Sequence, residues 1–266
     1  MATLVCFHAH PDDEAIATGG LMATSAAAGH RVILVCATRG EQGEPQEGVL
    51  DPGEALADRR TQELAKSCEL LGAEPPIFLG YEDSGMIDEP ANENPASFWQ
   101  ADHDEAVARL VTILSDVDVD VLTIYDDHGG YGHPDHIRVH SVGLAAAQEL
   151  ELAHVYESTI NRDRVREMVK AAQQPDSDLG LDESDVDVET FGTENVDISF
   201  ELDVRQVTSQ KKAAITAHRS QVGPDSFFLK IPDEAFDVAF GYEWFNIPKV
   251  SGTGGPQVVS VLPGLD

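Results

Sequence analysis

The chain has 266 residues, 42% of them apolar, and its 48 acidic against 17 basic residues give a formal net charge of −31. This length suits one large α/β domain with a full hydrophobic core. The acidity argues against nucleic acid or an anionic membrane as a partner, because too few cations are present to neutralise phosphates. No apolar run approaches the roughly 18 residues of a membrane span, and none is expected.

The compartment is predicted from the first residues and the cysteines. Residues 1–9 lack the basic and long apolar regions of a signal peptide and are typical of a first strand. Three dispersed cysteines, Cys6, Cys36 and Cys68, suit a reducing compartment, so a cytoplasmic location is expected. The acidity is densest in residues 176–203, which contain no Lys or Arg and are predicted to form a solvated surface loop. A host with a salty cytoplasm is an alternative explanation of the overall charge.

Apolar strands and helical patterns alternate along the chain, which is typical of a Rossmann-like, doubly wound α/β fold with a mostly parallel sheet. Strands are predicted at 3–8, 31–37, 76–79, 119–125, 153–158 and 196–202. Helices are predicted at 13–28, 54–72, 102–115, 134–150, 162–173 and 204–219.

Two segments of one domain are expected. Residues 1–172 form the Rossmann-like core, and residues 173–266 form the acidic loop and a C-terminal α+β elaboration packed on the same domain. The aromatic-rich tail after residue 219 is interpreted as a flap packed over the sheet edge, with an interface in a homo-oligomer as the alternative.

Two segments share one pattern: His10-Pro11-Asp12-Asp13 and His133-Pro134-Asp135-His136. Each follows an apolar strand and opens a helix, with Pro at the first helical position. Residues three apart lie on one face of a helical turn, so both segments direct side chains into one space. That space lies at the carboxyl ends of parallel strands, where open α/β sheets bind ligands.

A metal site explains this pattern better than helix capping does. A single His-Pro-Asp at a helix start is usually a capping device, but two on separate βα turns are hard to explain that way. His10, Asp13 and His136 form a sound Zn²⁺ ligand set that leaves one position open, as catalytic sites require. Fe²⁺ fits the same donors.

The remaining members of the two segments are predicted to carry out the chemistry. Asp12, adjacent to the ligand Asp13, is placed to act as general base on water. His133 either protonates the leaving nitrogen or stabilises the oxyanion. Asp135 orients one of the histidines.

The residues His10 to Glu14, Thr38 to Glu41 and Gly129 to His136 together resemble the signature of the PIG-L/LmbE-type deacetylases. That family removes acetyl groups from N-acetylglucosaminyl conjugates and includes the mycothiol-type deacetylases and S-conjugate amidases. The resemblance runs from residue 3 to about 165 and, less distinctly, through residues 217–221.

The resemblance implies the same ligands, base and acid or electrophile as above, and it adds further residues. It makes Tyr131 a movable hydroxyl donor to the substrate carbonyl, and it implies contacts to the sugar conjugate from Glu44, Arg60 and Asp83. By themselves, Arg59 and Arg60 indicate only surface ion pairs at a helix start.

The predicted function is a zinc-dependent hydrolase that removes an acetyl group from an N-acetylglucosamine-like or amino-sugar conjugate by metal-activated water. A mycothiol S-conjugate amidase, which cleaves a larger thiol-sugar conjugate, is the alternative enzyme. A non-catalytic metal-binding or regulatory protein is the alternative of another class, and the presence of Asp12 argues against it, since a metal binder needs no base.

Overall fold

The computed structural model describes residues 1–172 and 188–266. Within them, eight strands form a single sheet in the order β3-β2-β1-β4-β5-β7-β6-β8. The strands are β1 (Thr3–His8), β2 (Arg31–Cys36), β3 (Ile77–Phe78), β4 (Val121–Tyr125), β5 (His154–Thr159), β6 (Phe200–Asp203), β7 (Tyr242–Asn246) and β8 (Gln257–Val259).

The first five strands are parallel. In the sheet, β2 and β3 lie on one side of β1, and β4 and β5 lie on its other side. A parallel sheet opens a crevice at the carboxyl ends of its strands where the order reverses in this way. The structure therefore places the two His-Pro-Asp segments, which follow β1 and β4, on either side of this crevice. The predicted fold class is confirmed.

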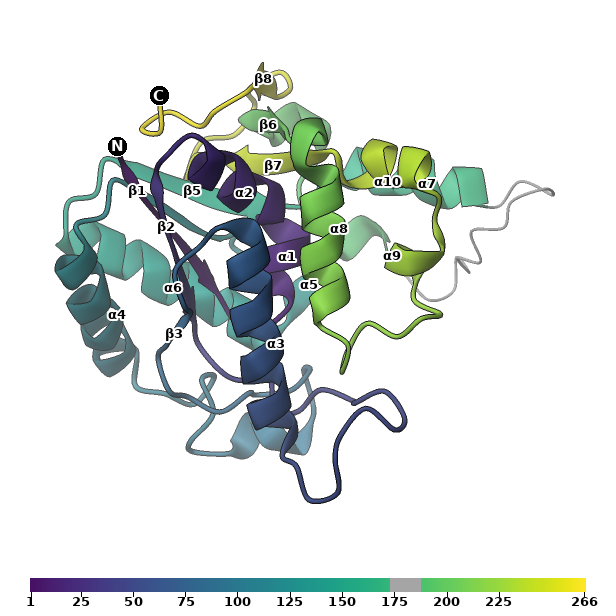
Figure 1. Ribbon diagram of the computed structural model, residues 1–266. Coiled ribbons are helices and arrows are strands. Elements are labelled where there is room, and N and C mark those ends of the chain that lie inside the picture. The colour runs from purple at the N-terminus through teal and green to yellow at the C-terminus, as the bar shows by residue number, and fades with distance from the viewer. Residues whose placement is uncertain (173–187) are drawn as a thin grey trace.

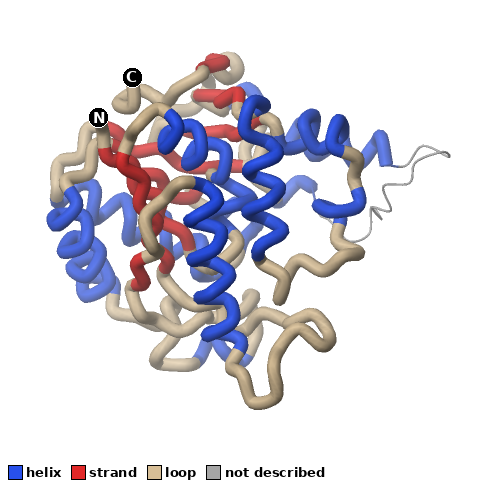
Figure 2. The backbone as a smooth tube through the Cα atoms, viewed as in Figure 1, coloured by secondary structure: helices blue, strands red, loops and turns tan. Residues whose placement is uncertain are grey.

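Helices cover both faces of the sheet (Figures 1 and 2). The main ones are α1 (Asp13–Ala17), α2 (Gly19–Ala27), α3 (Leu56–Leu71), α4 (His103–Val117), α6 (Pro134–Glu149), α7 (Arg162–Ala172) and α8 (Thr208–Ala217), with short helices at α5 (Gly129–Gly132), α9 (Phe227–Lys230) and α10 (Asp233–Phe240). Successive β1 side chains point to opposite faces. Leu4 and Cys6 pack in the core under α2, α3 and α8, and Val5 and Phe7 pack in the core under α4 and α6.

The helix predicted at 13–28 is two helices, so that prediction is wrong in its continuity. Thr18 leaves the helical conformation, with φ −133° and ψ 11°, and α2 starts directly after it. The buried Glu243 carboxylate accepts hydrogen bonds from the backbone amides of Gly20 and Leu21 at 2.7 and 2.8 Å. A carboxylate satisfies the free amides of a helix's first turn, so a new helix begins here.

The flap prediction for the aromatic tail is wrong for β7, which is a strand of the sheet, whereas the phenylalanines before it lie in α9 and α10 and pack on the core. β7 is inserted between β5 and β6 and pairs antiparallel with both. Burial alternates from Tyr242 to Phe245, and Phe245 is completely buried. Aromatic residues favour a pleated strand of this kind, but which neighbours such a strand pairs with depends on contacts distant in sequence.

Part of the acidic stretch, residues 176–187, lies outside the described residues. From Val188 to Asp203 the chain forms short 3₁₀ turns and then β6. Because β6, β7 and β8 join the sheet of the first 172 residues, the C-terminal segment packs on the core, while the proposed boundary at residue 172 stays a prediction. Over the described ranges, none of the helices has the length and apolarity to cross a bilayer.

The burial of β7 predicts a large cost for truncating its core side chain. Phe245→Ala should lower the free energy of unfolding by about 3–5 kcal/mol, because a fully buried ring leaves a cavity. Val258→Ala on the edge strand β8, where the side chain is 64% exposed, should change it by less than about 0.5 kcal/mol. Chemical denaturation measures both. Equal small effects would mean that the tail packs peripherally.

Candidate metal centre

The two His-Pro-Asp segments converge at the carboxyl ends of β1 and β4. Three imidazoles, those of His10, His133 and His136, each bring a ring nitrogen within 4.8 Å of the others, and all three are buried. His133 is the N-cap of α6, and its Nδ1 accepts a hydrogen bond from the Asp135 amide at 3.1 Å. His133 therefore caps α6 and also belongs to the histidine cluster, so the capping and metal-site interpretations of this motif are compatible.

The Asp13 carboxylate lies between two of these rings. Its Oδ2 is 3.5 Å from His10 Nδ1 and 3.4 Å from His136 Nε2. Two donors that each lie about 2.0–2.1 Å from a tetrahedral ion are themselves about 3.4 Å apart, and both separations match that spacing. Burial alone would raise the pKa of Asp13, but the two imidazoles hold it well below its usual range.

The other nitrogen of each ring is held by an acceptor. His10 Nε2 faces Asp135 Oδ2 at 3.1 Å and Asp83 Oδ1 at 3.4 Å, and His136 Nδ1 donates to the Gly129 carbonyl at 3.2 Å. These contacts fix each ring so that its opposite nitrogen, His10 Nδ1 or His136 Nε2, is directed at Asp13 Oδ2. Such orientation is what ligand histidines require.

Asp135 is completely buried and has a full set of donors. Besides His10, its carboxylate accepts from the Ser84 amide at 2.9 Å and from the Ser84 hydroxyl. The aspartate therefore joins α6 to the loop after β3 and fixes the His10 ring. The prediction that Asp135 orients a histidine fits this geometry.

Asp12 has an unusual backbone. Its φ of 110° and ψ of −30° lie in a region that L-residues rarely adopt. In this conformation the Asp12 carboxylate pairs with Arg60, whose Nη2 lies 3.1 Å from Asp12 Oδ2. Burial raises the pKa of Asp12 to about 6, although the Arg60 guanidinium opposes the shift.

Arg60 is buried, so the interpretation of it as a surface residue is wrong, whereas Arg59 does form an ion pair, with Glu54. The Arg60 guanidinium donates to the carbonyls of Pro11 at 2.5 Å and Gly40 at 2.9 Å. Gly40 has φ +68°, and a Cβ there would collide with this guanidinium.

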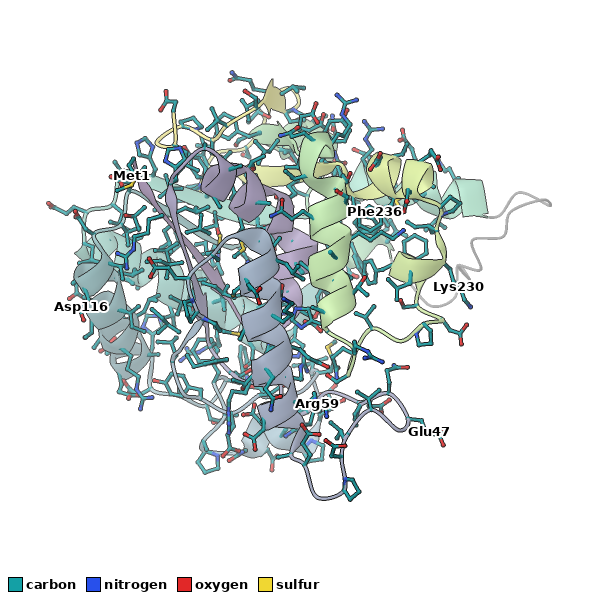
Figure 3. The ribbon with its side chains drawn as sticks, in the orientation of Figure 1. Met1, Glu47, Arg59, Asp116, Lys230 and Phe236 are labelled. Atoms are coloured by element: carbon teal, nitrogen blue, oxygen red, sulfur yellow. The ribbon has the colours of Figure 1, made fainter. Side chains whose placement is uncertain are left out.

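Asp83 is also buried and receives internal hydrogen bonds on both oxygens. Gln42 N donates to Oδ2 at 3.2 Å and Gly85 N to Oδ1 at 2.8 Å. Burial would raise the pKa of Asp83, but His10 holds it far below its usual range. Glu44, by contrast, is exposed in the 37–55 loop, which projects from α3 near Arg59 and carries Glu47 at its tip (Figure 3). Of the three residues expected to contact the sugar, Arg60 and Asp83 are thus buried, and only Glu44 is exposed.

The Tyr131 ring packs against His133 and His136, with ring centroids 6.3 and 4.9 Å away. Tyr131 is 38% exposed, and its hydroxyl lies 3.5 Å from His136 Nε2. It sits between Gly129, Gly130 and Gly132, all at positive φ. Burial lowers the pKa of His133 to about 4, and the neighbouring His10 and His136 add to this shift.

Several residues around the cluster were given no role from the sequence. Tyr125, the last residue of β4, stacks on His136 with ring centroids 4.3 Å apart. Glu41 Oε2, rather than Glu44, accepts from the Asp83 amide at 3.1 Å. Ser84 and the buried Glu14 also belong here. A strand-end position is a usable signal for Tyr125, but the other three contacts join segments that no local pattern connects.

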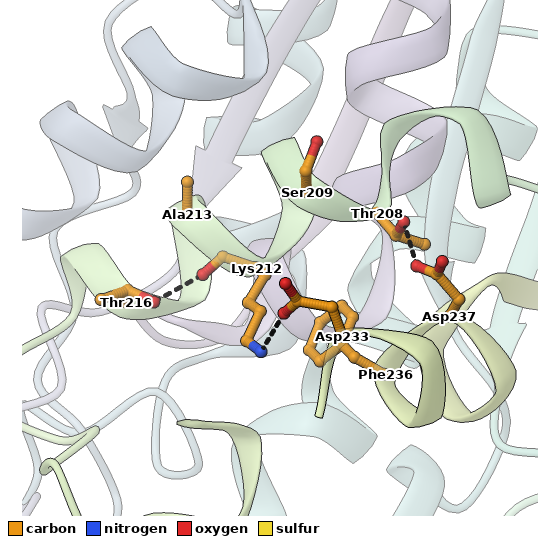
Figure 4. Close-up of a pocket in the computed structure, with 8 residues that line it drawn as sticks. All are labelled: Thr208, Ser209, Lys212, Ala213, Thr216, Asp233, Phe236 and Asp237. Carbon is orange, nitrogen blue, oxygen red and sulfur yellow. Dashed lines mark hydrogen bonds and ion pairs between the residues drawn. The ribbon is translucent and has the colours of Figure 1, made fainter. Parts of the chain in front are cut away.

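A separate hollow of about 400 Å³ lies between α8 and α10 (Figure 4). None of the predicted site residues lines it. Its one ammonium group, on Lys212, pairs with Asp233 at 2.8 Å, and Thr208 donates to Asp237. Its ammonium and both of its carboxylates are thus already bonded to neighbours within the hollow, so we assign the chemistry to the histidine cluster.

The fold is shared by several solved structures. N,N′-Diacetylchitobiose deacetylase from Pyrococcus horikoshii superposes with a TM-score of 0.57 at 24% identity, covering 92% of this chain and 82% of that one. The 4-carboxy-2-hydroxymuconate hydratase from Pseudomonas putida KT2440 gives a TM-score of 0.57 at 18% identity, covering 94% of this chain and 98% of that one. One of these proteins is a deacetylase and the other a hydratase, so this likeness shows the fold alone.

Sequence relatives are closer. A 1D-myo-inositol 2-acetamido-2-deoxy-alpha-D-glucopyranoside deacetylase from Acidothermus cellulolyticus is 39% identical over 96% of this chain and 90% of its own length. A protein of the same name from Thermobispora bispora is 38% identical over 97% and 91%. The family model described as PIG-L, GlcNAc-PI de-N-acetylase, matches residues 5–147. The predicted deacetylase activity is thus confirmed over the S-conjugate amidase alternative, and the chain belongs to the PIG-L family.

Proposed function

We propose that this protein removes the acetyl group from an N-acetylglucosamine unit linked to inositol, with a divalent metal held by His10, Asp13 and His136. The observation that carries the ligand assignment is the Asp13 oxygen placed 3.5 and 3.4 Å from two oriented ring nitrogens. The substrate class follows the names of relatives that match more than 90% of this chain.

The donor set supports Zn²⁺ and also accommodates Fe²⁺. When bound, such an ion polarises a carbonyl oxygen and makes water a stronger nucleophile. The protein's own part is to fix three donors, and with three protein ligands a tetrahedral ion would keep a fourth position for water or substrate. A site of this kind is catalytic rather than structural.

Asp12 is proposed as the general base. Its pKa of about 6 suits a group that is ionised near neutral pH yet basic enough to accept a proton from water. Asp13, next in the chain, has a depressed pKa and two imidazole partners, which suits a ligand and not a base. The contrast between neighbouring carboxylates supports the division of roles.

His133 is proposed to donate a hydrogen bond to the developing oxyanion. Because its Nδ1 accepts from the Asp135 amide, the neutral ring carries its proton on Nε2. With a pKa near 4, the ring is neutral at pH 7, which favours electrophilic stabilisation over transfer of a proton to the leaving nitrogen. Tyr131 is proposed as a second donor to the same oxygen, since its exposed ring sits among glycines.

The contacts to the sugar stay predictions. Glu44 is exposed and offers a free carboxylate to a hydroxyl group. Arg60 and Asp83 are already held by internal partners, so we propose that they act mainly by placing Asp12 and His10, and that the sugar reaches only their outer edges.

The proposed activity predicts acetate release by the zinc-loaded protein from the inositol-linked N-acetylglucosamine, and slower release from free N-acetylglucosamine. Asp12→Asn should retain metal and fold while kcat falls about 10²–10⁴-fold, the usual contribution of acid–base catalysis. Enzymatic acetate detection and metal analysis measure both. A fully metal-loaded wild-type protein that releases no acetate from any N-acetyl sugar would refute the proposal and favour a non-catalytic metal binder.

The ligand assignment predicts that His10→Ala or His136→Ala loses most bound metal, because two remaining ligands hold Zn²⁺ poorly. His140→Ala is the matched control. It lies one turn further along α6, bonds to the Tyr125 carbonyl at 3.0 Å, and should keep a full equivalent. Metal analysis after dialysis measures the content and also identifies the native ion. Full metal in both ligand variants would show that another set holds it.

A further inference from the structure

A buried acid–imidazole pair lies directly beneath Asp12. Glu14 in α1 and His218 at the end of α8 are both fully buried, and His218 Nε2 is 2.7 Å from Glu14 Oε1. The two residues are 204 positions apart in the chain. A buried charge pair of this kind is expensive to desolvate and is not needed to fill a core, so its position calls for another explanation.

The second oxygen of Glu14 supplies that explanation. Glu14 Oε2 accepts a hydrogen bond from the backbone amide of Asp12 at 2.9 Å. Asp12 is held at φ 110°, a conformation that costs free energy and persists only when its surroundings impose it. Ser67 donates to the first Glu14 oxygen, so the carboxylate has donors from α3, from α8 and from Asp12 itself.

We propose that Glu14 and His218 form a positioning unit that holds the Asp12 main chain in its left-handed conformation and so aims the Asp12 carboxylate at the reacting atoms. This rests on the proposed function, in which Asp12 is the base. His218 and Ser67 fix the Glu14 carboxylate, which in turn fixes the Asp12 amide. Arg60 holds the same residue at its carboxylate, so Asp12 is restrained at both ends.

The chain provides a matched control on the same helix. Lys211 in α8 pairs with Glu243 at 2.6 Å, and both side chains are as buried as the Glu14–His218 pair. Glu243 holds the amides of Gly20 and Leu21 instead of that of Asp12. Removing either pair should weaken the fold, but only the Glu14–His218 pair should affect the base.

The test compares Glu14→Ala, Glu14→Gln and Glu243→Ala in the metal-loaded protein. Glu14→Ala should lower kcat per bound metal about 10–100-fold, as loss of an orienting partner does, with KM within about twofold. Glu14→Gln keeps a carbonyl oxygen for the Asp12 amide and should recover most of that loss. Glu243→Ala should lower stability and leave kcat per bound metal within about twofold.

Hydrogen exchange at the Asp12 amide gives a readout independent of turnover. Exchange followed by ¹⁵N-resolved NMR should accelerate at least about tenfold in Glu14→Ala, since the amide loses its acceptor, and stay at the wild-type rate in Glu243→Ala. If Glu14→Ala does not fold, Glu14→Asp, whose carboxylate is one methylene shorter and is drawn away from the Asp12 amide, should show faster exchange at Asp12 than the wild type. Glu14→Ala or Glu14→Asp with wild-type kcat and wild-type exchange at Asp12 would overturn the proposal. A wild-type protein inactive on every N-acetyl sugar would refute the proposed function, while the exchange rates would still decide the positioning role.

Discussion

The buried carboxylate of Asp135 is the group on which the arrangement of the site depends. A carboxylate removed from water is stable only with several donors, and this one takes them from His10 and from the amide and hydroxyl of Ser84. These partners come from the segments that follow β1 and β3, while Asp135 itself follows β4. Three loops must therefore meet before the charge is satisfied. Once they do, the His10 ring is oriented, and its other nitrogen faces Asp13.

The C-terminal third of the chain makes buried contacts to the N-terminal residues next to the metal centre. Helix α8 and its C-terminal residue contribute two buried basic side chains that pair with carboxylates. Lys211 pairs with Glu243, and His218 pairs with Glu14. The first pair fixes the start of α2, and the second lies under Asp12. The family model ends at residue 147, yet the relatives match more than 90% of the chain. Residues beyond the matched core are thus tied to the same centre by buried contacts, and they do more than extend the sheet.

Local signals accounted for most of the fold and for the members of the cluster. Apolar strands and helical periodicity are short-range features, and the helices predicted at 54–72 and 102–115 are close to α3 and α4 of the structure. The His-Pro-Asp segments could be placed together because the carboxyl ends of parallel strands share one edge. The place of β7 between β5 and β6, and the contact of Glu14 with a histidine 204 residues away, could not be predicted this way. Both depend on contacts between segments that are distant in the sequence. The break at Thr18 depends on the place of β7 as well, because Glu243 of β7 accepts the amides that begin α2.

Two adjacent carboxylates reach opposite electrostatic states because they have different partners. Asp13 faces two imidazoles, which hold its pKa well below the usual range. Asp12, at a positive φ, pairs with Arg60, and burial together with the neighbouring Asp13 raises its pKa to about 6. A pair of titratable groups whose surroundings drive their pKa values apart is the usual sign of a divided catalytic role. A strain of about 1–3 kcal/mol at Asp12 is therefore offset by buried contacts at its amide and carboxylate, and the same contacts make one neighbour suited to hold a metal and the other suited to accept a proton.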